Sequence, residues 1–275
     1  MDFKSLTNKI TQPLFFRSLI KSAVLFMILF LSGCLGSKQT ETNPRIINNP
    51  DYIAINKEKP DQPNYLSLAR TLVKKGYFDI ALVQLEKALE MSGKNPEIFF
   101  LMGSCHRGKK NYTAALISFN KSIRIDPDYA PSYNGMGILC DLTGNATGAI
   151  KNFSQAIKIN PARPDFHNNI GFSLLCTRNF KKAQQYFKTA LTLDSGFFLA
   201  KHNLALCMGL SGNTTDALDL LNSTFSPAAA MNNMGAIYRL KNNNEKADMF
   251  FTNALSIDSN LKAAKKNLSS QKKEL

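Results

Sequence analysis

The sequence predicts an all-α fold, a superhelical solenoid of about six stacked helix pairs with a C-terminal capping helix. An alanine followed four residues later by a phenylalanine recurs every 34 residues, in Ala115/Phe119, Ala149/Phe153 and Ala183/Phe187. An apolar residue followed by glycine precedes each pair at a fixed offset, as Met102-Gly103, Met136-Gly137 and Ile170-Gly171. Self-similarity at one period is typical of repeat proteins, in which each unit buries its apolar face against the next.

Each unit can be understood as two antiparallel helices. The glycine stands at the eighth place of the first helix, where it allows the second helix to pack closely. On the second helix, the phenylalanine lies one turn after the alanine and fills the core between units. Pro127 and Pro161 close two units, because a proline disfavours helical backbone at the residue before it.

This pattern resembles the tetratricopeptide repeat (TPR), a helix pair of about 34 residues. The resemblance covers residues 62–261 and implies a concave face along the first helices. Ser195 and Ser259 depart from it, since they stand where a proline would close the unit. We expect six units, at 62–95, 96–129, 130–163, 164–197, 198–227 and 228–261, followed by a basic capping helix and tail at 262–275.

The fifth unit breaks the phase. It begins at Phe198 and runs only 30 residues before Ala228 starts the next unit. The missing residues fall near LNSTFSPAAAMNN, 221–233, which predicts a shortened second helix and a turn at Ser226-Pro227.

The stretches AKHNLALCMGLSG and SPAAAMNNMGAIYRL flank this break. They resemble the lipoprotein of the tight-adherence (Flp) pilus assembly system, a family often called TadD. The resemblance is strongest over residues 164–240 and implies a TPR lipoprotein that acts in pilus assembly. The nearest alternative is the type IV pilus pilotin, a family that also combines a lipobox with six TPR units. The shortened fifth unit favours the resemblance to TadD.

The N-terminal residues 1–33 have the layout of a signal peptide. Nine apolar residues, from Ala23 to Leu31, follow the basic residues Lys4, Lys9, Arg17 and Lys21, whereas a membrane-spanning helix needs about 20. Leu31-Ser32-Gly33-Cys34 resembles the bacterial lipobox, which implies acylation of Cys34 and cleavage before it. The residue after the cysteine is Leu35 and not aspartate, and in the lipobox family this permits sorting to the outer membrane. An ordinary anchor or a chance cysteine is the alternative.

Residues 34–61 follow as the lipidated cysteine and a tether. The tether is rich in proline and has little periodic apolar content, so it cannot bury enough surface to offset its ordering entropy. The chain has a net charge of +14, and residues 1–33 hold four basic residues and one acidic, which leaves +11 after cleavage. Such a charge favours anionic partners. Export makes nucleic acid the least favoured of these.

No constellation of residues indicates catalysis, a cofactor or a small-molecule substrate. His106, His167 and His202 lack a carboxylate or cysteine at metal-binding spacing, and His106 falls at a core aromatic position, so we expect it to be buried. We also expect the cysteines of the repeats to act as buried apolar residues, because packed helix axes are farther apart than a disulfide allows. They are Cys105, Cys140, Cys176 and Cys207.

Peptide-binding TPR proteins hold their ligands on the first helices, and this resemblance supplies the candidate site. Asparagine amides can donate to and accept from a peptide backbone, and the apolar members could bury a partner's side chains. The alternative is that the asparagines cap or pack within the repeats. The Lys/Asn set that clamps a terminal carboxylate in chaperone-binding members is absent. The candidate residues are Phe100, Asn134, Asn168, Asn169, Phe172, His202, Asn203, Leu206, Asn232 and Asn233.

Together these features predict a non-catalytic scaffold, or pilotin-like lipoprotein, for a pilus or secretion machine. We expect it to be anchored in the bacterial cell envelope at the outer membrane, facing the periplasm. It would bind a protein such as the secretin on the concave face. The alternative of another class is a basic protein that binds nucleic acid or an anionic surface.

Overall fold

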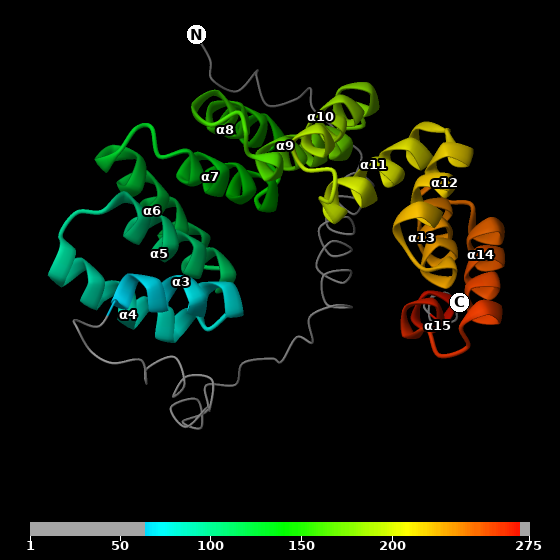
Figure 1. Cartoon of the computed structure of the whole chain (residues 1–275), viewed down its shortest axis with the longest axis horizontal. Helices are drawn as coiled ribbons and strands as arrows, with labels where there is room; N and C mark the ends of the chain where they lie inside the picture. The colour runs from blue at the N-terminus through cyan, green and yellow to red at the C-terminus, as the bar shows by residue number, and fades with distance from the viewer. Residues whose placement is uncertain (1–63, 270–275) are drawn as a thin grey trace, which may run out of the picture. The chain divides into compact units, whose positions relative to one another are not determined.

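The computed structural model describes residues 64–269, which form helices and no β-strand (Figure 1). The all-α prediction is therefore confirmed. The predicted signal peptide, Cys34 and the tether lie outside the described residues, as do residues 270–275. No helix within 64–269 is long and apolar enough to cross a membrane. The helices are α3 (Tyr65–Lys75), α4 (Phe78–Ser92), α5 (Pro96–Gly108), α6 (Tyr112–Ile125), α7 (Ala130–Leu142), α8 (Ala146–Ile159), α9 (Pro164–Cys176), α10 (Phe180–Leu193), α11 (Phe198–Ser211), α12 (Thr214–Thr224), α13 (Pro227–Leu240), α14 (Asn244–Ile257) and α15 (Lys262–Ser269).

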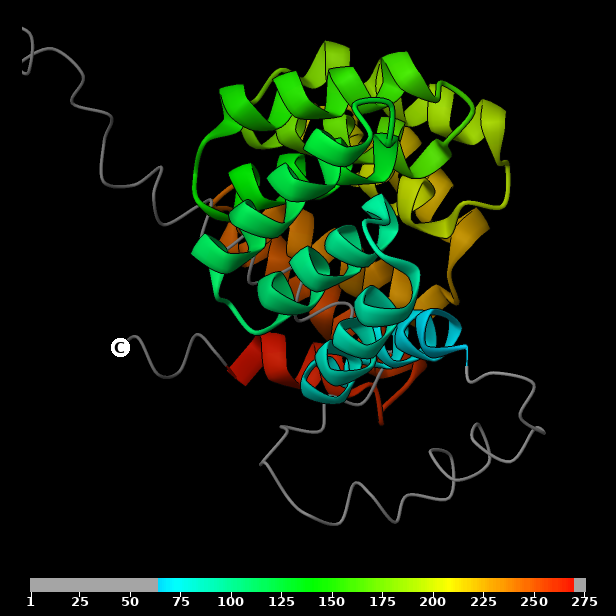
Figure 2. The same ribbon diagram turned by 90° about the vertical axis from the view of Figure 1, so that its left-hand side faces the viewer.

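The helices pack as six consecutive pairs, from α3/α4 to α13/α14, and each pair also contacts the next (Figure 2). Successive first helices, such as α5 and α7, contact one another directly. Within the described chain, successive second helices approach each other less. The first helices therefore form the inner row of the solenoid. At the end of the array, α15 packs on α13 and α14 and buries Ala264, as a capping helix does.

Asparagine starts many of these helices. Its side-chain oxygen accepts a hydrogen bond from a backbone N–H of the first turn, which has no partner within the helix. Proline occupies the first position of α5, α9 and α13, where its missing N–H costs nothing. The capping residues are Asn64, Asn95, Asn111, Asn145, Asn213 and Asn243.

The recurring glycine and phenylalanine meet inside the second, third, fourth and sixth pairs. Phe187 on α10 is fully buried and lies so close to Gly171 on α9 that a Cβ there would come within 2.7 Å of the ring. Phe119, Phe153 and Phe251 oppose Gly103, Gly137 and Gly235 in the same way. The predicted packing of these pairs is confirmed. The first and fifth pairs instead bury an alanine and a leucine at the two positions, Ala69 with Leu85 and Ala205 with Leu221.

The phase break in the sequence corresponds to α12. This helix has 11 residues, whereas α10 and α14 have 14. Phe225 ends it in extended backbone, and α13 begins at Pro227 with Ser226 as its N-cap. The Phe225 ring turns back onto α11, with its centroid 4.7 Å from that of Phe198.

Candidate protein-binding face of the first helices

The candidate residues divide into two groups by burial. Six are partly exposed on the first helices, and we call them the first-helix face. The other four are buried: Asn168, Asn203, Asn232 and Asn233. The exposed group comprises Phe100, Asn134, Asn169, Phe172, His202 and Leu206.

The asparagines bind one another across neighbouring first helices. Each contact joins the sixth residue of one unit to the fifth residue of the unit before it. We call the three contacts amide rungs, and Asn168 also donates to Asn169, at 3.4 Å, which links two of them. The rungs are Asn169 Nδ2 to Asn134 Oδ1 (2.9 Å), Asn203 Nδ2 to Asn168 Oδ1 (2.9 Å) and Asn267 Nδ2 to Asn232 Oδ1 (3.0 Å).

These rungs give the asparagines a structural role. Asn168 is only 1% exposed, and a buried amide that loses its partner costs about 1–3 kcal/mol. A ligand could reach the buried amides only by breaking rungs. For the three buried asparagines in rungs, Asn168, Asn203 and Asn232, packing within the repeats is therefore the better interpretation. Asn134 and Asn169 join a rung and remain partly exposed.

Between the second and third rungs, no rung of the described chain joins the fifth unit to the sixth. His202 replaces asparagine at the fifth position there, and burial lowers its pKa to about 4. Its ring lies edge-on to Phe225, with centroids 5.7 Å apart. Within residues 64–269, the amide of Asn233 makes no hydrogen bond, although the residue is only 5% exposed.

The apolar members of the face are anchored in the core. Phe172 and Leu206 pack against the buried cluster that contains Phe187. Phe100 contacts Phe119, with ring centroids 6.1 Å apart, and Tyr129, at 5.9 Å. Rigid, partly exposed apolar side chains of this kind are suited to covering a partner's apolar groups.

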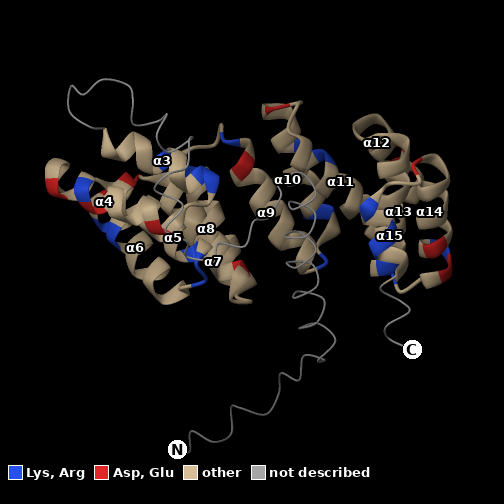
Figure 3. Ribbon diagram, turned by 90° about the horizontal axis from the view of Figure 1, so that it is seen from below, with Lys and Arg blue, Asp and Glu red and all other residues tan. Residues whose placement is uncertain are grey.

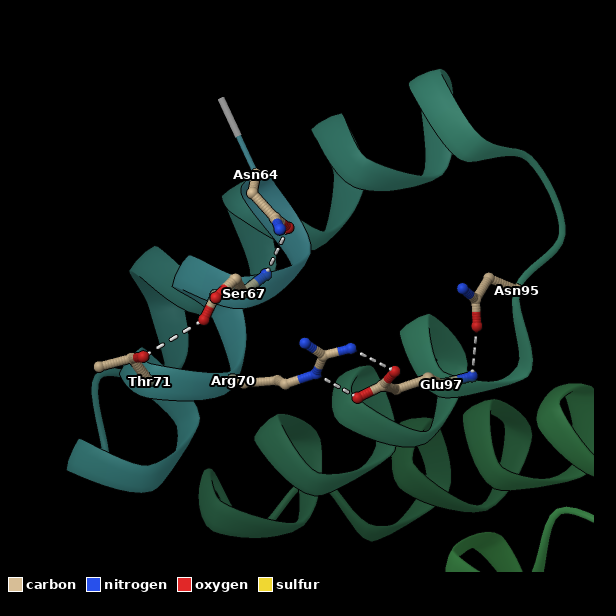
Figure 4. Close-up of polar contacts among 6 residues, drawn as sticks. All are labelled: Asn64, Ser67, Arg70, Thr71, Asn95 and Glu97. Carbon is tan, nitrogen blue, oxygen red and sulfur yellow. Dashed lines mark hydrogen bonds and ion pairs between the residues drawn. The ribbon is translucent and has the colours of Figure 1, made fainter. Parts of the chain in front are cut away.

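A charged pair lies beside Phe100 at the start of the array. Arg70 on α3 binds Glu97 on α5 through two contacts, of 2.5 Å and 2.7 Å (Figure 4). Glu97 in turn lies at the start of α5, where Asn95 caps the helix. Tyr129 is close to this pair, and burial together with the Glu97 charge raises its pKa to about 12.

Three features of the face were not predicted from the sequence. Phe198 is 53% exposed beside Phe225. The carboxyl of Asp141 accepts a 2.5 Å hydrogen bond from Ser173, and burial raises its pKa to about 6. Arg107 is half-buried near the end of α5. The run HRGKK, 106–110, was the one available signal for Arg107.

The remaining chemistry is sparse. Within residues 64–269, no group of histidine, cysteine and acidic side chains could hold a metal ion. His106 is only half-buried, in the last turn of α5, so the prediction that it is buried was wrong. Of the four cysteines among the described residues, Cys105 and Cys207 are buried as predicted, while Cys140 and Cys176 are partly exposed.

In the described helices, positive charge is not confined to one part of the array (Figure 3). Figure 3 shows lysine and arginine spread over most helices, with aspartate and glutamate among them. Nucleic-acid binding depends on many coordinated phosphate contacts, so this distribution gives the nucleic-acid alternative no support.

Comparison with known families identifies the repeat. Residues 66–130 and 228–261 match the tetratricopeptide repeat, and residues 142–175 match a TPR repeat family. The chain is a TPR repeat protein. TPR units generally mediate protein interactions rather than catalysis. No curated protein matches the sequence.

Solved TPR structures share the fold at low sequence identity. PilW, described as a widely conserved type IV pilus biogenesis factor, matches with a TM-score of 0.62 at 20% identity, covering 74% of this chain and 96% of PilW. PilF of Pseudomonas aeruginosa matches with a TM-score of 0.58 at 16% identity, covering 75% and 96%. A TPR protein of Parabacteroides merdae matches with a TM-score of 0.56 at 17% identity, covering 92% and 97%.

Proposed function

We propose that this TPR protein is a non-catalytic, pilotin-like scaffold for assembly of a pilus or secretion machine of the Flp (tight-adherence) type. Its first-helix face binds a component of that machine, such as the secretin. The observation that carries the proposal is the row of anchored apolar side chains, Phe100, Phe172 and Leu206, along the inner helices of a six-pair array.

The structural neighbours support a role in pilus biogenesis without choosing the machine. The description of PilW links this fold to the type IV pilus, which makes a type IV pilus pilotin the second candidate. The shortened α12 and the TadD-like sequence on its two sides favour the tight-adherence system.

A lipid anchor at Cys34 is part of the proposal. The acyl chains hold the protein at the outer membrane, where each buried CH₂ contributes about 0.8 kcal/mol. Residues 35–61 tether the array to that anchor on the periplasmic side. A short flexible tether keeps the face at an effective concentration of the order of millimolar near a membrane-bound partner.

Deletion of the gene for this protein tests which machine it helps to assemble. The secretins of the Flp and type IV systems are followed as multimers on unboiled gels, together with surface pili. We expect loss of the Flp secretin multimer alone. Loss of the type IV multimer alone would support the second candidate, and normal multimers with normal pili would refute both.

A Cys34→Ser variant tests the anchor. Lipid transfer to a lipobox acts on the thiol of the cysteine, and serine lacks this thiol. We therefore expect no uptake of radioactive palmitate and no stable membrane attachment. Thermal unfolding of the array should match the wild type, because the substitution lies outside the repeats. A variant that stays membrane-bound and fully active, or a wild type without label, would overturn the lipoprotein assignment.

A further inference from the structure

Arg107 lies on the same side of α5 as Phe100. The two residues are seven apart, and seven residues of an α-helix turn the chain to within about 20° of its starting direction. The rise over that distance is about 10 Å. Arg107 therefore extends the first-helix face by two turns, toward the turn between α5 and α6, and is half-buried there.

The guanidinium of Arg107 has no acceptor among the described residues. Within residues 64–269 it makes no hydrogen bond, ion pair or ring contact. Three other arginines, Arg70, Arg163 and Arg239, each bind a carboxylate. The last two described arginines, Arg124 and Arg178, are exposed to water. Arg107 is thus the one described arginine that is partly covered and unpaired.

An unpaired charge that is partly removed from water raises the energy of the folded protein. Burial accordingly lowers the pKa of Arg107. The carbonyl end of α5 offsets part of this cost, by about 0.3–1 kcal/mol. The neighbouring turn adds positive charge, since Lys109 and Lys110 follow directly, and only Lys109 has an acidic partner, Asp79.

We propose that Arg107 binds a carboxylate of the partner, in a segment that places an apolar side chain on Phe100. Guanidinium and carboxylate form paired, charge-assisted hydrogen bonds, which suit a partly desolvated site. A segment in the polyproline II conformation advances about 3.1 Å per residue and turns once in three residues, so side chains three positions apart lie on one side of it, about 9 Å apart. The partner motif is therefore apolar-x-x-acidic.

The next unit determines the register in which the partner segment binds. Asp141 stands 34 residues after Arg107, at the equivalent place on α7, and Ser173 already donates to its carboxyl. An acidic side chain shifted by one unit would meet Asp141 and be repelled. This inference rests on the proposed use of the first-helix face as a protein-binding surface, but it concerns the ligand and not the machine.

The test uses the full-length protein in detergent and three fluorescent, acetylated heptapeptides of alanine and glycine. The first has leucine at position 2 and glutamate at position 5, with an amidated C-terminus. The second has glutamine in place of glutamate. The third also has glutamine but a free terminal carboxylate. Fluorescence polarisation measures their affinities for the wild type, for Arg107→Met, and for Arg124→Met, which removes an exposed arginine as a matched control.

We expect the wild type and Arg124→Met to bind the glutamate peptide at least tenfold more tightly than the amidated glutamine peptide. Arg107→Met should abolish this preference. A preference for the free C-terminus would assign the site to a terminal carboxylate instead. Equal affinities for all peptides, or no binding of any, would overturn the proposal.

Thermal unfolding separates a binding role from a structural one. Arg107→Met should unfold at the wild-type temperature or above it, because it removes an uncompensated charge. Arg70→Met should unfold at a lower temperature, because it leaves Glu97 without its partner. A loss of stability in Arg107→Met as large as in Arg70→Met would assign Arg107 to the fold. None of these results depends on the secretin experiment, so either proposal can fail without the other.

Discussion

The fourth and fifth helix pairs perform the same packing with different residues. In α9/α10, the large ring of Phe187 fills the space that Gly171 leaves open. In α11/α12, the equivalent residues are Leu221 and Ala205, and both are buried. A smaller side chain on the second helix is thus matched by a larger one on the first. The fold conserves the total volume between the helices rather than either residue.

The two pairs also differ in how they receive the next unit. Ile237, at the tenth place of the sixth unit, lies against Gly209, at the twelfth place of the fifth unit. A Cβ at Gly209 would lie 2.7 Å from the Ile237 side chain. The equivalent position of the fourth pair holds the larger, buried Leu175. The same two places contact each other between the third and fourth units, where Ser173 donates to Asp141, so the contact does not depend on the short α12. Gly209 instead makes room for the large side chain of Ile237.

The largest expected change in the free energy of unfolding comes from substitutions in the cores of the fourth and fifth helix pairs. Phe187→Ala should reduce the free energy of unfolding by about 3–5 kcal/mol, because it leaves a cavity opposite Gly171. Leu221→Ala removes fewer atoms and should cost less. Urea unfolding measures both, with hydrogen exchange to localise the damage. Equal losses would contradict the view that the fourth pair depends on its ring.

Substitution of His202 should reduce the pH dependence of the free energy of unfolding. Its pKa is about 4 in the folded protein and 6.5 in the unfolded chain, so between these values the unfolded state binds more protons. Stability should therefore fall by about 1–3 kcal/mol as the pH decreases from about 6.5 to 4. His202→Asn, which copies Asn168 of the fourth pair, should lose this component. The opposing contribution of Asp141 is present in both proteins and cancels in the difference.

The rungs offer a matched pair of substitutions. Asn203→Leu deprives the buried Asn168 oxygen of its donor and should cost about 1–3 kcal/mol. Asn233→Leu makes the same change where the described structure holds no rung, and should cost much less. Chemical unfolding of the two variants compares them directly. A greater loss for Asn233→Leu would show that its amide has a partner in solution.

Gly209→Ala tests the contact between Gly209 and Ile237. The added methyl group must displace Ile237, and overpacking of this kind costs about 1 kcal/mol or more. Combining it with Ile237→Val should recover part of the loss, which a thermal melt of each variant would reveal. If the second substitution only adds to the damage, the contact is not the cause.

The smallest effect concerns the turns within the two pairs. Arg178 has a positive φ of 60° at the turn of the fourth pair, where the fifth has Gly212 at 108°. The left-handed region costs a residue with a side chain about 1–2 kcal/mol. Glycine avoids this cost, but it loses about 0.5–1 kcal/mol more through its greater conformational freedom in the unfolded chain. Arg178→Gly should thus stabilise the protein by up to about 1 kcal/mol in urea unfolding, and Gly212→Arg should destabilise it.

The sequence was sufficient to predict the helix pairs because their signals are local. Gly171 and Phe187 lie 16 residues apart and recur with one period. The chain break at Ser226-Pro227 was equally visible, since it interrupts that period.

The site could be predicted only in part, because burial depends on contacts between units. Asn203 reads as a ligand-binding amide until Asn168, 35 residues earlier, is seen to accept its hydrogen bond. Nothing in the sequence distinguishes it from Asn169, which keeps an exposed side. Arg107 was missed for the same reason: its isolation is apparent only when the partners of the other arginines are known.

The amide rungs also bear on how a repetitive chain avoids misassembly. Helix pairs with similar Gly/Phe cores could dock in the wrong order, or against another copy, with little loss of apolar contact. A buried amide placed one residue out of register would instead face apolar atoms with no hydrogen-bond partner. The line from Asn134 through Asn169 and Asn168 to Asn203 therefore penalises wrong neighbours among the third, fourth and fifth pairs.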